Sequence, residues 1–189
     1  MKEGRTLAIG AHPDDVELGC AGSLYKLPQS LIFLVFSECS TRRKQEQLKS
    51  AKIFDAEVHF GDLYGNTYRE NVREVENLIS LEVENVYLHW KEDTHQDHRY
   101  VYDIVLSALR RFNGNIFLYE TPSSLNFVPN VFVDISDHFE AKLNVFGHHV
   151  SQNKTKTYLK KWIQATARYR GCQRHTSYAE GFVAYQLME

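Results

Sequence analysis

The sequence predicts an α/β fold, a mostly parallel sheet with helices on both faces. Short apolar runs of strand length alternate along the chain with segments in which apolar residues recur at helical spacing. Two of these runs lead directly into polar residues that open a helix, as happens at the carboxyl ends of parallel strands. The 189 residues contain no internal repeat, low-complexity segment or linker, so we expect one domain over residues 1–189.

Strands are expected where apolar residues run uninterrupted between polar or turn-forming residues. The first covers residues 6–10 (Thr-Leu-Ala-Ile-Gly) and the second residues 31–36. The remaining candidates are residues 57–60, 86–88, 116–119, 131–135 and 181–186. The last of them closes the chain, and we expect it to be an edge strand.

Helices are expected between these strands, beginning with one that follows residue 15. The others cover residues 42–55, 71–81, 101–112, 137–150 and 158–172. In the last helix, the predicted apolar stripe consists of Tyr158, Trp162, Ala165 and Tyr169. Basic residues accompany this stripe over residues 154–174, either as a solvated face or as an anchor for a phosphate or nucleotide on a substrate.

Composition argues against several classes of protein. A net charge of −2 gives no reason to expect nucleic acid as a partner. No apolar run approaches the roughly 20 residues of a membrane span, and the first strand begins too early to leave room for a signal peptide. The cysteines, Cys20, Cys39 and Cys172, are odd in number and lack a CxxC spacing. Reduced thiols and a cytoplasmic location are therefore expected.

A polar cluster follows the first strand at residues 12–15, which read His-Pro-Asp-Asp. Pro13 fixes its own φ and disfavours a helical His12, so the turn is stiff. His12, Asp14 and Asp15 can bind a metal or move protons, and they lie where ligands bind in open α/β sheets. The alternative is structural, because either aspartate could simply cap the following helix.

A second polar cluster, at residues 95–98, follows the strand at residues 86–88 and precedes the helix at 101–112. His95 and His98 are three residues apart, so both can face the same way at a helix start. Asp97 between them is placed to orient one ring. Zinc enzymes use three ligands from His, Asp and Glu and leave one position for water, so the two clusters together predict a metal site.

These motifs resemble those of the LmbE-like, or PIG-L, family of zinc-dependent de-N-acetylases. The resemblance rests on residues 12–22, which begin His-Pro-Asp-Asp, and on residues 95–98. Further matches are Arg-x-x-Glu at 43–46, the His-x-Ser-Gln motif within residues 148–152, and the closing segments 170–171 and 178–182. The resemblance implies a Rossmann-like fold with the site at the carboxyl ends of the strands.

The resemblance also implies the role of each site residue. His12, Asp15 and His98 would hold the metal, which is expected to be Zn²⁺ with Fe²⁺ as the alternative in the cell. Asp14 would be the general base on the attacking water. The remaining roles are oxyanion stabilisation or amine protonation by His95, tuning of His95 by Asp97, and contacts from Arg43 to sugar hydroxyls. A helical ion pair between Arg43 and Glu46 is the structural alternative for Arg43.

The implied activity is removal of an acetyl group from an N-acetylated sugar or glycoside of the GlcNAc type. Bound zinc lowers the pKa of water to about 7 and polarises the amide carbonyl. Two alternatives remain, a metal-retaining sugar-binding module and a metallohydrolase acting on another amide or ester. Dinucleotide binding is disfavoured because no G-x-G-x-x-G follows the first strand. The sequence leaves open whether the chain forms a homo-oligomer.

Overall fold

The computed structural model describes residues 4–27, 30–36 and 40–188. The strands are β1 (Arg5–Gly10), β2 (Leu31–Val35), β3 (Glu57–Phe60), β4 (Val83–His89), β5 (Asn115–Tyr119), β6 (Val131–Asp134) and β7 (Ala179–Gln186). The helices are α1 (Asp15–Gly19), α2 (Ala21–Leu24), α3 (Thr41–Ile53), α4 (Tyr68–Ile79), α5 (Gln96–Ala108), α6 (Phe139–Phe146) and α7 (Asn153–Cys172). Short 3₁₀ turns cover Leu109–Arg111, Ser136–His138 and Val150–Gln152.

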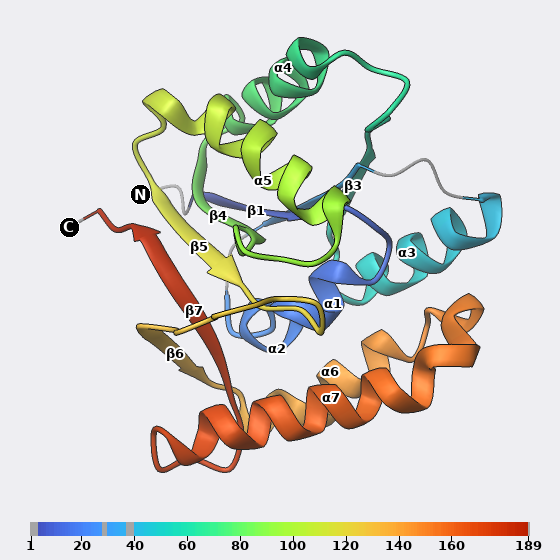
Figure 1. The fold of residues 1–189 in the computed structure, drawn as a ribbon, viewed down its shortest axis with the longest axis vertical. Coiled ribbons are helices and arrows are strands. Elements are labelled where there is room, and N and C mark those ends of the chain that lie inside the picture. The colour runs from blue at the N-terminus through green and yellow to red at the C-terminus, as the bar shows by residue number, and fades with distance from the viewer. Residues whose placement is uncertain (1–3, 28–29, 37–39, 189) are drawn as a thin grey trace.

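The strands form one seven-stranded sheet in the order β3-β2-β1-β4-β5-β7-β6 (Figure 1). The first five in this order are parallel, with Ala8 of β1 opposite Phe33 of β2 and Tyr87 of β4. Strand β7 is antiparallel to both of its neighbours. The order of the parallel strands reverses between β1 and β4, so the crevice beyond Gly10 and His89 is the switch point where such sheets bind ligands.

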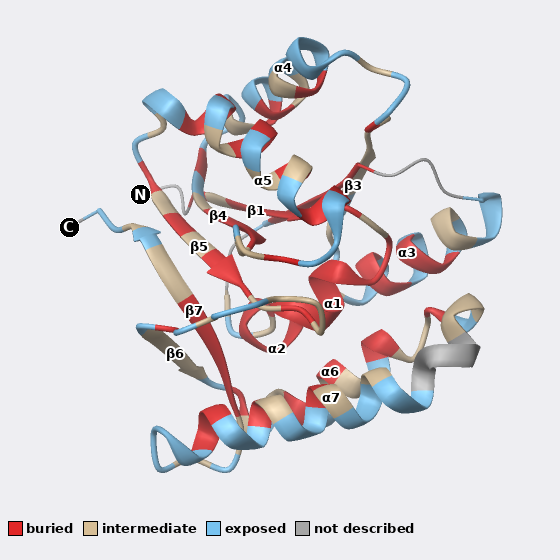
Figure 2. Cartoon of the chain, viewed as in Figure 1, coloured by how far each residue is buried: buried red, intermediate tan, exposed pale blue. Residues whose placement is uncertain are grey.

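Two hydrophobic layers cover the sheet, because successive strand residues point to opposite faces. Leu7 and Ile9 of β1 pack with α4 and α5, whereas Ala8 packs with residues of α1, α2 and α3. Helices α6 and α7 extend the second layer through a further cluster around Phe146. Figure 2 shows the buried residues concentrated in the strands and on the inward stripes of the helices. The predicted α/β fold with helices on both faces is therefore confirmed.

The prediction that the closing strand is an edge strand is wrong. Strand β7 lies between β5 and β6, and β6 forms the edge. The first four residues of β7, Ala179 to Phe182, are all buried. These four residues pair with β6, and the strand pairs with β5 from Phe182 to Gln186. The predicted strand over residues 181–186 did not include Ala179 and Glu180, which pair only with β6.

Several helices differ from their predicted bounds. Helix α5 begins at Gln96 rather than at 101, because its polar first turn carries no apolar repeat. The helix predicted over residues 137–150 is α6 at Phe139–Phe146, flanked by 3₁₀ turns. In α7, the apolar stripe is also displaced. Tyr158 and Tyr169 are 61% and 60% exposed, and Leu159, Ile163 and Ala167 make the core contacts instead.

Three remaining expectations concern single segments. The predicted loop over residues 37–41 lies largely outside the described residues, as does Cys39. Cys20 is buried, Cys172 is exposed, and both are free thiols. None of the described helices combines the length and the apolar character needed to cross a membrane.

Candidate active site

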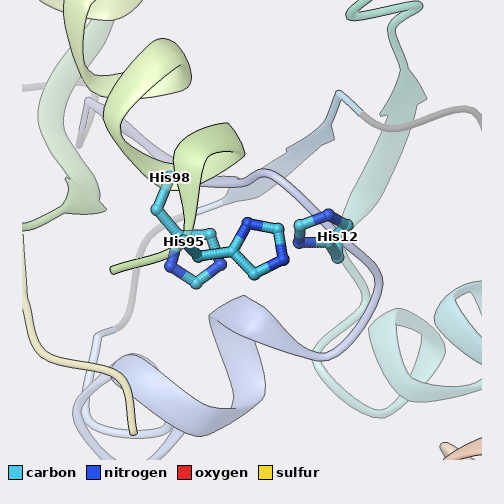
Figure 3. A group of neighbouring side chains, drawn as sticks. All are labelled: His12, His95 and His98. Atoms are coloured by element: carbon cyan, nitrogen blue, oxygen red, sulfur yellow. The ribbon is translucent and has the colours of Figure 1, made fainter. Parts of the chain in front are cut away.

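The two polar clusters meet at the switch point of the sheet. His12 follows β1, and His95 and His98 lie at the start of α5, just after β4 (Figure 3). The ring centroid of His95 lies 4.6 Å from that of His12 and 4.7 Å from that of His98. Residues more than 80 positions apart in sequence therefore form one cluster, as the sequence predicts.

Asp15 lies between His12 and His98. Its Oδ2 atom is 3.5 Å from His12 Nδ1, and its Oδ1 atom is 3.5 Å from His98 Nε2. In a tetrahedral zinc site with bonds of about 2.0–2.1 Å, neighbouring ligand atoms lie about 3.3–3.4 Å apart. The separation of Asp15 from each of the two histidines is therefore close to the spacing of neighbouring ligands around a divalent ion.

Each of these histidines is held by a carboxylate on its other nitrogen. His12 donates from Nε2 to Asp97 Oδ2 at 2.9 Å, and His98 donates from Nδ1 to Asp93 Oδ2 at 3.0 Å. A neutral ring held in this way carries its lone pair on the nitrogen that faces Asp15, which is the nitrogen that would bind an ion. This arrangement fixes the tautomer that a metal ligand needs, as carboxylates do in known zinc sites.

Asp93 is a site residue that the sequence analysis missed. Besides His98, its side chain accepts hydrogen bonds from the hydroxyls of Thr121 and Ser124 and from the backbone N–H of His95. The sequence did offer one indication of this role, because Asp93 lies only two residues before His95. Asp97 was expected to orient His95, but its carboxylate contacts His12 instead, with Tyr64 donating to its other oxygen.

His89 is a second residue that the sequence analysis left without a role. Its ring is fully buried at the end of β4, stacked on His98 with centroids 4.0 Å apart. Its Nε2 atom accepts from the backbone N–H of Ala11 at 3.0 Å and lies 3.2 Å from Asp15 Oδ2. Two groups of side chains have ligand atoms that all lie within 4.8 Å of one another, namely His12, His95 and His98, and Asp15, His89 and His98.

The charges of the cluster favour a cation at its centre. Burial lowers the pKa of His98, but Asp15 and Asp93 outweigh it and raise the pKa to about 10. Burial raises the pKa of Asp15, yet the neighbouring His98 and His89 hold that pKa well below its usual value. Burial lowers the pKa of His89 to about 4, so this ring is neutral. Positive charge is therefore stabilised between Asp15 and Asp93, where His98 lies.

Asp14 is distinguished from Asp15 by its backbone and its surroundings. Its φ of 104° lies in the left-handed region, which non-glycine residues rarely adopt. Although Asp14 is the N-cap of α1, its side chain makes no capping hydrogen bond. Burial and the adjacent Asp15 raise the pKa of Asp14 to about 7. Asp14 can therefore exchange a proton near neutral pH, and the structural interpretation of this residue as a simple helix cap does not hold.

His95 is the N-cap residue of α5, and its side chain faces solvent. Its Nδ1 atom accepts a hydrogen bond from the backbone N–H of Asp97, which leaves the proton on Nε2. Burial and the neighbouring His98 lower the pKa of His95, so the ring is a neutral hydrogen-bond donor. Such a donor suits an oxyanion that forms in the adjacent cavity.

Arg43 points into the site rather than along its own helix. Its Nη2 atom donates to the Pro13 carbonyl at 2.9 Å and lies 3.5 Å from Asp14 Oδ1. Glu46 instead pairs with Arg42, so the alternative of an Arg43–Glu46 ion pair is not what the structure contains. The guanidinium thus belongs to the first polar cluster.

A cavity of about 530 Å³ opens over this cluster. Its lining includes the site residues His12, Asp14, Asp15, Arg43, His95 and His98. The other lining residues are Leu18, Thr94, Thr121, Pro122, Ser123, Gln152, Tyr158 and Leu159. The cavity is large enough for a small molecule of one or two rings. It brings together all the residues predicted from the sequence except Asp97, which lies behind His12.

Comparisons with known proteins agree with the motifs. Residues 7–109 match the PIG-L family, described as GlcNAc-PI de-N-acetylase. A protein of Escherichia coli (strain K12) named uncharacterized deacetylase YaiS is 33% identical over 167 residues, covering 77% of this chain and 90% of that protein. The diacetylchitobiose deacetylase of Thermococcus kodakarensis is 29% identical over an alignment of 217 positions, covering 94% and 81%.

A solved structure with the same fold carries a different activity in its name. The 4-carboxy-2-hydroxymuconate hydratase GalB of Pseudomonas putida KT2440 superposes with a TM-score of 0.85 at 16% identity, over 99% of each chain. A likeness at this identity concerns the fold only. The fold alone therefore does not fix the reaction, which depends on the residues of the site.

Proposed function

Because the chain belongs to the PIG-L family, we propose that it is a metal-dependent hydrolase that removes the acetyl group from an N-acetylated sugar or glycoside. The observation that carries this proposal is the position of Asp15 between His12 and His98, with Asp14 beside it. Two histidines and one carboxylate with these separations match the ligand set of catalytic zinc sites. Asp14, the fourth group, has a pKa suited to proton transfer.

His12, Asp15 and His98 would hold the ion, Zn²⁺ or, in the cell, Fe²⁺. When bound, the ion would act as a Lewis acid on the amide carbonyl and would lower the pKa of the attacking water. Asp14 accepts the proton of that water as it attacks the carbonyl carbon. Because Asp14 is buried and fixed at the start of α1, it needs little reorganisation to do so.

The neighbouring side chains act on the later steps. His95 donates a hydrogen bond from Nε2 to the oxyanion of the tetrahedral intermediate, and the leaving amine takes up the proton that Asp14 removed from water. Asp97 orients His12 rather than His95, which revises the expected role of this carboxylate. Arg43 lines the cavity and offers a planar fork of donors to the hydroxyls of the sugar.

The direct test measures acetate release from N,N′-diacetylchitobiose and N-acetylglucosamine by protein reconstituted with zinc. We expect acetate from the reconstituted protein, loss of the activity after complete chelation, and its return with zinc. Acetate release that persisted without any metal would contradict the metal dependence. Sugar binding without acetate release from any of a broad set of N-acetylated sugars would favour the binding module instead.

A further inference from the structure

The peptide unit that joins Pro13 to Asp14 is held at both ends by one face of α3. Arg43 donates from Nη2 to the Pro13 carbonyl at 2.9 Å. The N–H of Asp14, at the other end of the same peptide unit, donates to Gln47 Oε1 at 3.3 Å. Arg43 and Gln47 are four residues apart, so their side chains project from the same side of the helix.

This peptide unit precedes the most unusual backbone conformation in the site. Asp14 has a φ of 104°, and an aspartate stays in such a conformation only where its surroundings hold it there. The direction of the Asp14 side chain depends on the orientation of this peptide unit. The two hydrogen bonds from α3 therefore set where the carboxylate points.

A carboxylate from α1 fixes the orientation of the Gln47 amide. Gln47 donates from Nε2 to Glu17 Oε1 at 2.8 Å, and the Ser50 hydroxyl donates to the same oxygen. Because a carboxylate oxygen accepts, the amide NH₂ must face Glu17, which turns Oε1 toward the N–H of Asp14. All three of these side chains are fully buried, so no exposed solvent competes for them.

We propose that Gln47 is a positioning residue for Asp14, with Glu17 and Ser50 fixing its amide and Arg43 holding the opposite end of the peptide unit. The inference rests on the proposed function, in which Asp14 accepts a proton. Among the hydrogen bonds found in the described part of the chain, the Gln47 side chain bonds to Asp14 and Glu17 and to none of His12, Asp15 and His98. Gln47 thus acts on the base without touching the metal ligands.

The test replaces Gln47 by methionine, which has nearly the same length but neither donates nor accepts as an amide does. We expect kcat on N,N′-diacetylchitobiose to fall about 10- to 100-fold, the cost of a small misplacement of a reacting group. Zinc content and KM should stay close to those of the wild type. The matched control is Gln45→Met, the same change on the exposed face of α3, which should leave kcat unchanged.

A double-mutant cycle separates positioning from a general structural role. If Gln47 acts through Asp14, then Gln47→Met should cause no further loss of activity in the Asp14→Asn background. Losses that multiply in the double variant, or loss of zinc together with activity, would overturn the inference. Should Gln47→Met fail to fold, Gln47→Asn keeps an amide that is one methylene too short, and we expect the same loss of kcat.

A second readout does not depend on activity. Hydrogen exchange at the backbone N–H of Asp14, followed by NMR, should be at least about 10-fold faster in Gln47→Met than in Gln45→Met, because its acceptor is lost. Equal exchange in the two variants would overturn the inference even if the wild type deacetylates sugars. Absence of acetate release by the wild type would instead refute the proposed function, and the exchange measurement would still test the contact.

Discussion

Asp14 and Asp15 are adjacent and chemically identical, yet their surroundings give them different properties. Asp15 faces His12, His89 and His98, which hold its pKa well below the usual value. Asp14 lies in the left-handed region with a pKa raised to about 7. One carboxylate is thus kept ionised for coordination, and the other remains available to exchange a proton.

The contact between Asp93 and His98 predicts the effect of removing a carboxylate that does not itself bind the ion. Asp93→Ala should weaken zinc binding about 10- to 100-fold, because His98 loses the partner that fixes its tautomer. His98→Ala should be more severe, since a ligand itself is lost. Competition titration against a chelator measures both. Asp103→Ala, an exposed change on α5, the helix that carries His98, is the control. Wild-type zinc affinity in Asp93→Ala would contradict this role.

The sequence predicted that His12, Asp14, Asp15, His95 and His98 form one cluster. They follow the carboxyl ends of two parallel strands, and such ends lie at the same edge of a sheet. The sequence did not identify Asp93 or His89, whose roles depend on which ring nitrogen faces which neighbour. It also assigned Asp97 to the nearer histidine in sequence. In space, the carboxylate of Asp97 reaches His12, 85 residues away.

At the scale of elements, a buried ion pair joins α1 to the segment before α7. His149 Nε2 lies 3.4 Å from Glu17 Oε2, and both side chains are almost fully buried. Burial lowers the pKa of His149, but Glu17 and Asp14 outweigh it and raise it above 6.5. Burial raises the pKa of Glu17, but His149 and Ser50 outweigh it and lower it below 4.5.

This pair predicts a pH dependence of stability. A histidine whose pKa is raised on folding contributes fully below pH 6.5, and its contribution disappears as the pH rises through the folded-state value. His149→Leu should therefore lower the free energy of unfolding by roughly 3 kcal/mol near about pH 6, with a smaller difference from the wild type at high pH. Thermal unfolding of the wild type and of His149→Leu, from about pH 6 to high pH, measures this difference in stability. A difference that stayed constant or grew with pH would contradict the prediction.

The boundaries of the elements show where periodicity stops being informative. The first turn of α5 is Gln-Asp-His-Arg, which has no apolar repeat, so the sequence placed the helix start five residues late. The aromatic residues Tyr158 and Tyr169 suggested the inward face of α7, yet the smaller Leu159, Ile163 and Ala167 occupy it. Tyr158 lines the cavity instead, where an exposed aromatic ring is available to a ligand.

At the scale of the whole molecule, the closing strand is tied to the first part of the chain through a buried carboxylate. Glu180 of β7 accepts from the backbone N–H groups of Gly22 and Ser23 at 2.9 and 2.7 Å. Lys142 of α6 donates to the same side chain at 2.5 Å. The contact joins α2, α6 and β7 beneath the site.

Glu180→Ala should therefore lower the free energy of unfolding by about 3–5 kcal/mol, because it leaves the buried ammonium of Lys142 and two backbone N–H groups without their acceptor. Glu140→Ala, an exposed change on α6, should alter it by less than about 0.5 kcal/mol. Urea unfolding measures both. A loss below about 1 kcal/mol in Glu180→Ala would mean that the carboxylate contributes little to this contact.

The architecture was predictable because alternating strands and helices with short loops allow few arrangements. The place of β7 was not, since inserting a strand between β5 and β6 depends on contacts between distant segments. The site lies where the parallel order reverses, between β1 and β4. The same fold occurs in GalB, a hydratase by name, so the reaction must be tested at the side chains themselves.

The substitution Asp14→Asn tests the central claim most directly, because asparagine keeps the shape of the side chain, tolerates the left-handed backbone and cannot accept the proton. Zinc content and acetate release from N,N′-diacetylchitobiose would be measured on the same preparation. We expect full zinc content, little change in KM, and a kcat lowered at least about 10²- to 10⁴-fold. A variant with full zinc and near wild-type turnover would show that Asp14 is not the base.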